Sequence, residues 1–175
     1  MILPIIHYPH PVLKVAALPI ERVDDRIRQL ASDMLETMKN ADGVGLAAPQ
    51  VAESLRMIAV CWPKPDGKPG DPRVLVNPKL TLSKEKVCER EGCLSFPKLY
   101  AEVRRSRRVT LHSEDLDGNK IIEEVEGYGA RVLQHEMDHL DGALFIDRMG
   151  PAAKFSLREG LVALEQEASN PKVEE

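Results

Sequence analysis

Two histidines and a glutamate in the second half of the chain have the spacing of a metal-assisted hydrolase. His135 and His139 are four residues apart, and Glu136 directly follows the first. On a helix this spacing places the two imidazoles about 40° apart around the axis and one turn apart along it, so both can reach one ion. Glu136 would then reach a water at that ion without being a ligand. The alternative is an amphipathic helix with two surface histidines.

A catalytic metal site usually has a third protein ligand and leaves one position for water. Cys93 is a candidate, in the segment Glu91–Ser95 (EGCLS), where Gly92 permits close backbone approach. The alternative for Cys93 is a buried, inert thiol, the commoner fate of a cysteine. Cys61 falls in an apolar strand pattern and is assigned to that alternative, whereas Cys88 stays undecided.

A third segment, Gly43–Gln50 (GVGLAAPQ), combines small residues with one amide side chain. It lacks the lysine of a phosphate loop and the third glycine of a dinucleotide-binding fingerprint. Its glycines and alanines suggest a backbone that approaches another group closely, and Gln50 offers amide donors. Taken alone, the segment is better interpreted as a loop that ends a helix and leads into a strand.

Together the three segments resemble the three motifs of peptide deformylases, in the same order. The third motif is Gln134–Gly142 (QHEMDHLDG), and the resemblance extends from Ile6–Leu13 to the final helix. It implies a hydrolase that removes the N-formyl group from the N-terminal formyl-methionine of newly made proteins and releases formate. The residues without the resemblance indicate only a metal-dependent hydrolase.

The resemblance also implies roles for individual residues. The metal ligands would be Cys93, His135 and His139, with Glu136 as the catalytic carboxylate. The Gln50 side chain and the backbone N–H of Leu94 would be the oxyanion donors. The slot for the methionine side chain would be formed by Val44, Gly45, Tyr128, Arg131 and Val132. Tyr128 and Arg131 are bulkier or more polar than the aliphatic residues often found there, which leaves the size of the slot open. The family's native ion is usually Fe(II), with zinc, nickel or cobalt as substitutes, and a His/His/Cys set suits zinc as well.

The elements that must position these residues follow from local patterns. Apolar residues at three- and four-residue steps predict a helix over 24–40, capped by Asp24 or Asp25 and ended by Gly43. Strands are predicted over 56–62 and 73–77, and the turn 117–119 predicts a hairpin that returns over 121–125. Helices follow over 128–140 and from Pro151 or Ala152 to about Gln166.

This order predicts an α+β fold: short, mostly antiparallel strands around a central metal-binding helix, with an N-terminal and a C-terminal helix. Residues 1–169 are expected to form a single catalytic domain, and residues 170–175 a frayed tail. Glu91 either pairs with Arg105, which would hold the Cys93 loop, or both are independent exposed charges. Asp138 and Gln134 could hydrogen-bond the outer shell of the metal ligands, the alternative for Asp138 being a solvated helix-face charge.

Composition limits the remaining function classes. The chain has 175 residues and a net charge of −4, which argues against dedicated nucleic-acid binding. The basic run Arg104–Arg108 is interpreted as a solvated loop or strand edge, because aromatic residues that could stack on RNA are nearly absent around it. Three cysteines, no leader pattern and no apolar run of ~18 residues predict a cytoplasmic protein without a membrane span.

Two rival functions remain at this point. A metallopeptidase could use the same histidines and glutamate to cleave internal peptide bonds, although the Cys93 segment favours the deformylase. A non-catalytic protein with a structural metal would need a fourth ligand, from Cys61 or Cys88. The expected partners are formyl-methionyl peptide N-termini. For the mixed-charge last helix, packing on the domain is favoured over a transient ribosome contact.

Overall fold

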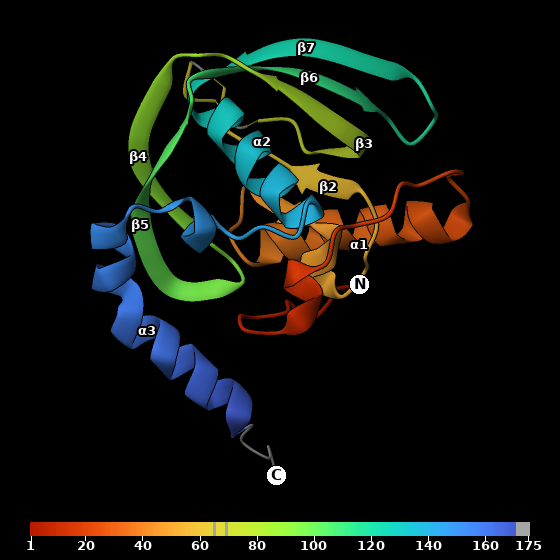
Figure 1. The fold of residues 1–175 in the computed structure, drawn as a ribbon. Coiled ribbons are helices and arrows are strands. Elements are labelled where there is room, and N and C mark those ends of the chain that lie inside the picture. The colour runs from red at the N-terminus through yellow and green to blue at the C-terminus, as the bar shows by residue number, and fades with distance from the viewer. Residues whose placement is uncertain (65, 69, 171–175) are drawn as a thin grey trace.

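In the computed structural model (Figure 1), which describes residues 1–64, 66–68 and 70–170, an N-terminal α-helix is followed by a run of antiparallel strands and then by two further α-helices. Within these residues, β1 to β3, β6 and β7 form a five-stranded antiparallel sheet in the order β1-β2-β3-β6-β7, and β4 and β5 form a separate hairpin. The strands are β1 Gly45–Ala47, β2 Met57–Val60, β3 Arg73–Leu82, β4 Lys86–Cys93, β5 Phe96–Ser106, β6 Arg108–Glu114 and β7 Lys120–Glu126. The predicted α+β class is confirmed.

Helix α1, Asp25–Asn40, covers one face of the sheet, and its apolar stripe packs on alternate residues of β2 such as Met57 and Ala59. Asp24 caps it by accepting a hydrogen bond from the Ile27 N–H at 2.9 Å, as predicted. The helix ends at Asn40, as predicted, but Gly43 does not supply the left-handed residue after it. Asp42, with φ 52°, takes the left-handed conformation expected of Gly43.

Helix α2, Gly127–Leu140, lies on the opposite face of the sheet, between the sheet and the β4–β5 hairpin (Figure 1). It packs on Ile58 and Val60, the residues of β2 that alternate with those facing α1. Because both faces of β2 are covered, all its residues are buried. The segment that carries the His-Glu-His spacing is therefore the central helix, as predicted.

The β4–β5 hairpin, which the sequence patterns did not predict, closes the other side of α2. Phe96 and Val103 of β5 pack on the short helix η3, Phe145–Arg148, and on Leu157 of α3. Helix α3, Pro151–Ser169, continues along the edge of the molecule (Figure 1), where Leu161 and Leu164 also pack on this cluster. The Tyr8 hydroxyl donates a 2.7 Å hydrogen bond to Glu165, which attaches α3 to the N-terminal segment.

The predicted hairpin turn 117–119 joins β6 and β7, with Gly118 at φ 82°. Among the described residues, no helix combines the length and the apolar character needed to cross a bilayer. Of the tail predicted to fray, Asn170 follows α3 directly, and the remainder lies outside the described residues.

Candidate metal centre

Helix α2 and the end of β4 bring one sulfur and two imidazoles together. The candidate ligand atoms of Cys93, His135 and His139 all lie within 4.8 Å of one another. The Cys93 sulfur is 3.2 Å from Nε2 of His139. The helical spacing supplies the two histidines, and the β4–β5 turn supplies the thiol. Among the described residues neither Cys61 nor Cys88 joins this group, so neither supplies a fourth ligand.

The charge balance of the site fits a cation. Burial lowers the pKa of His135, but the Cys93 sulfur and the Glu91 carboxylate outweigh burial and raise that pKa well above its ordinary value. The site thus favours a positive charge beside the sulfur and the imidazole, which a divalent ion would supply. Burial lowers the pKa of His139 well below its usual range, which favours the neutral, metal-binding imidazole.

Glu91 orients His135, a contact that the sequence patterns did not reveal. Its Oε2 accepts a 2.9 Å hydrogen bond from Nδ1 of His135, which leaves Nε2 of the ring for the metal. Burial raises the pKa of Glu91, but hydrogen bonds from His135 and Arg105 prevail and lower it to about 2. The carboxylate is therefore ionised at neutral pH.

Arg105 forms an ion pair with Glu91, so the alternative of two independent exposed charges is wrong. Its Nε and Nη2 donate to Glu91 at 2.8 and 3.0 Å, and its Nη1 donates to Asp138 at 2.6 Å. Arg105 is only 5% exposed, so the interpretation of the basic run as solvated is wrong at this residue. Buried Asp138 bonds Arg105 and Arg148, and Gln134 bonds the backbone of Ser106. Asp138 thus bonds the arginine that pairs with Glu91, the outer partner of His135, and is not a solvated helix-face charge. Gln134 has no such link in the described hydrogen bonds.

Glu136 lies on α2 beside the candidate ligands, against the backbone of β1. It is 4% exposed, and its Oε2 has no hydrogen-bond partner among the described residues. Burial raises its pKa to about 7. A buried carboxyl with an unpaired oxygen and a pKa near neutrality is suited to exchange protons with a bound molecule.

Gln50 is held by both ends of its amide. Its oxygen accepts a 2.8 Å hydrogen bond from the Ala47 N–H, and its nitrogen donates to the Ser95 hydroxyl at 3.1 Å and lies 3.6 Å from the Cys93 sulfur. The amide donor is therefore fixed beside the candidate ligands. Ser95, which orients it, was not among the residues singled out from the sequence.

The small residues of Gly43–Gln50 do permit close approach, as the sequence suggested. A Cβ on Gly43 would lie 2.9 Å from Cδ1 of Leu94, and one on Gly45 would lie 2.7 Å from Cδ of Glu136. The segment also leads from α1 into β1, as the simpler interpretation had it. Both interpretations therefore describe it correctly.

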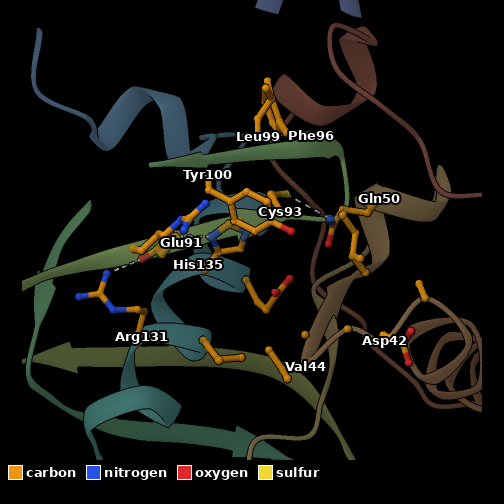
Figure 2. A pocket seen from close by; sticks show the side chains of 18 of the residues that line it. Asp42, Val44, Gln50, Glu91, Cys93, Phe96, Leu99, Tyr100, Arg131 and His135 are labelled. Atoms are coloured by element: carbon orange, nitrogen blue, oxygen red, sulfur yellow. Dashed lines mark hydrogen bonds and ion pairs between the residues drawn. The ribbon is translucent and has the colours of Figure 1, made fainter. Parts of the chain in front are cut away.

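A cavity of about 480 Å³ opens beside these groups (Figure 2), and Cys93, His135, Glu136, Gln50 and Leu94 line it. The residues expected to form the methionine slot line the same cavity: Val44, Gly45, Tyr128, Arg131 and Val132. Further lining residues come from the hairpin, among them Tyr100, whose ring lies 4.7 Å from the Arg90 guanidinium. The structure thus gathers the candidate donors and slot residues around one space, while His139 stays behind it in the core.

Comparison with known proteins supports this picture. A family model described as polypeptide deformylase matches residues 2–155. A peptide deformylase of Rhodopirellula baltica is 46% identical over 152 residues, which cover 86% of this chain and 74% of that protein. A peptide deformylase of Brucella suis is 42% identical over 171 residues, 97% of each chain.

Solved structures agree with the sequence relatives. The crystal structure of the plant peptide deformylase PDF1B has a TM-score of 0.90 and 39% identity, covering 97% of this chain and 92% of that one. The peptide deformylase of Thermotoga maritima has a TM-score of 0.79 at 39% identity, over 86% of this chain and 99% of the other. The chain therefore belongs to the polypeptide deformylase family and is a metal-dependent hydrolase.

Proposed function

We propose that Cys93, His135 and His139 hold one divalent ion, Fe(II) in the native enzyme, beside which this hydrolase removes the N-formyl group of nascent proteins. The donor set of one thiolate and two imidazoles suits Fe(II), zinc, nickel or cobalt. When bound, the ion would polarise the formyl carbonyl and lower the pKa of a water toward ~7. The residues 1–169 would act as one catalytic domain.

Glu136 would move the proton. It would accept a proton from the attacking water and then donate it to the leaving amine as the bond between formyl carbon and nitrogen breaks, so that formate and a free N-terminus result. The observation that carries this role is its buried carboxyl, with a pKa of about 7 and with Oε2 lacking a partner among the described residues. Such a group can both take and return a proton near neutral pH.

Gln50 and Leu94 would stabilise the negative charge that develops on the formyl oxygen. The Gln50 amide is fixed by Ala47 and Ser95, so no side-chain ordering is needed during the reaction. One preorganised donor of this kind is typically worth about 3 kcal/mol. Val44 and Val132 offer apolar walls for the methionine side chain, and Tyr128 and the Arg131 stem complete the slot.

The substrates would be formyl-methionyl N-termini of newly made chains in the cytoplasm. Free cysteines at positions 61, 88 and 93 are consistent with a reducing compartment. A transient contact of α3 with the ribosome stays a prediction, and the exposed Phe155 and Arg158 on that helix would be the residues to alter.

A substitution at Glu136 tests this function. Glu136→Ala should keep its metal in elemental analysis after anaerobic purification, yet release formate from a formyl-Met peptide at least ~10²-fold more slowly. As a control, the variant and the unchanged protein are both assayed for digestion of casein, which a metallopeptidase would cleave. Near-normal formate release by the variant would remove Glu136 from the mechanism, and casein digestion without formate release would contradict the deformylase assignment.

A further inference from the structure

Arg131 lines the cavity, but its guanidinium is engaged elsewhere. Only 3% of Arg131 is exposed. Figure 2 shows its side chain reaching away from Val44 and Gln50, on the opposite side of the cavity. Its Nη1 donates to Oε1 of Glu91 and to the Val103 carbonyl, each at 2.8 Å. The stem of Arg131 therefore borders the cavity, while its charged group bonds Glu91 and the hairpin backbone.

The same guanidinium ties helix α2 to both strands of the hairpin. Nη2 donates to the carbonyl of Val87 in β4 at 3.1 Å, and Nη1 bonds Val103 in β5. Nε lies 3.1 Å from the carboxylate of Glu89, whose side chain is 56% exposed. A planar group with several N–H donors can make all these contacts at once, which a lysine cannot. Arg131 thus sets where α2 lies relative to β4.

Glu91 needs this second arginine. Arg105 contacts both Glu91 oxygens but also bonds Asp138 at 2.6 Å, so its single charge is divided between two buried carboxylates. Arg131 adds a second arginine hydrogen bond on Oε1 of Glu91, while Oε2 accepts from Arg105 and from Nδ1 of His135. Arg131 also lies one helical turn before His135 on α2. Its hydrogen bond to Glu91 therefore holds the Glu91 carboxylate against the helical turn that carries His135.

We propose that Arg131 is a positioning residue, which holds Glu91 between α2 and the hairpin so that Glu91 directs the His135 ring toward the metal. This inference rests on the proposed metal-binding function. A ring held by an oriented carboxylate loses metal more slowly than a free one, and removal of such an outer partner typically costs ~10- to 100-fold in metal affinity or activity. An ordinary wall of the slot would instead affect substrate affinity.

The test uses the full-length protein loaded with Co(II), whose visible spectrum reports the ligand arrangement. Arg131→Leu keeps an apolar wall but removes every hydrogen bond of the guanidinium. We expect it to lose cobalt to a chelator ~10- to 100-fold faster, with an altered spectrum and a kcat reduced by a similar factor. Arg131→Lys can restore one contact to Glu91, so its rate of cobalt loss should lie between those of the unchanged protein and the leucine variant. The lysine variant carries the test if the leucine variant does not fold.

Two controls separate positioning from general effects. Glu89→Gln removes the exposed ion pair of Arg131 but not its bond to Glu91, and cobalt loss should stay within about twofold of the unchanged protein. Tyr128→Leu changes another slot wall and should alter KM without changing cobalt loss. Unchanged cobalt loss and spectrum in both Arg131 variants, or equally fast loss in Glu89→Gln, would overturn the inference. Failure of the unchanged protein to bind cobalt at all would instead refute the proposed function.

Discussion

The close approach of Gly45 to Glu136 can be tested by adding a single methyl group. In Gly45→Ala the new Cβ would lie 2.7 Å from Cδ and 2.9 Å from Cγ of Glu136. Ordinary carbon contacts are ~3.5–4.0 Å, so one side must move by about 1 Å. Gly45 is paired with Val60 in the sheet and is followed by fully buried Leu46. The Glu136 side chain is therefore the part that moves.

A displacement of about 1 Å at a catalytic group can cost ~10²-fold in rate, which corresponds to about 3 kcal/mol in transition-state stabilisation. We expect Gly45→Ala to lower kcat/KM for a formyl-Met peptide by about that factor, while the metal content is unchanged because no metal ligand is touched. The assay is formate release together with elemental analysis of the same preparation.

Gly150→Ala is the matched control. Nothing lies within 4 Å of a Cβ added at Gly150, and its φ of −70° suits alanine, so kcat/KM should not change. A Gly45→Ala enzyme within about twofold of the unchanged protein would refute the reasoning, because Glu136 would then tolerate displacement. Loss of metal in that variant would refute it also, since the disturbance would have spread beyond Glu136.

Three further predictions concern the surroundings of the site. Ser95→Ala removes the hydroxyl that orients the Gln50 amide. Because one neutral hydrogen bond is worth ~1 kcal/mol, kcat/KM should fall by about fivefold while the metal content is unchanged. An unaltered kcat/KM would mean that Ala47 alone holds the amide. The pKa of Glu91 is lowered to about 2, so its charge stabilises the fold above the ordinary carboxyl pKa and this contribution, about 3 kcal/mol, disappears as the pH falls toward 2. Urea unfolding from pH 6 to pH 2.5 should therefore show a smaller loss of stability in Glu91→Gln than in the unchanged protein, and parallel pH profiles would contradict this. Chiefly through its hydrogen bond to Glu165, the pKa of Tyr8 is raised to about 12, so Glu165→Gln should shift one tyrosine to a lower pKa in an ultraviolet absorbance titration, and an unchanged titration would contradict the contact.

Local patterns in the sequence determined helix α1 and helix α2, which carries both histidines and Glu136. The helices α1 and α2 repeat apolar residues with the period of a helix, so their bounds could be predicted within a residue or two. The relation of His135 to His139 is internal to one helix, and this is why spacing alone indicated a metal site. The three motifs together were specific enough to identify the family, because each constrains a different part of the site.

The tertiary structure alone decided which charges are buried and what they contact. Glu91 and His135 are 44 residues apart, and no local pattern reports their hydrogen bond. Arg105 and Arg131 looked like a solvated charge and a slot wall, because arginine is rarely buried unless it is paired. Their partners come from strands and a helix that meet only in the folded chain. The sequence thus determined the two histidine ligands through local spacing, and long-range packing determined how they are oriented and how Cys93 is brought to them.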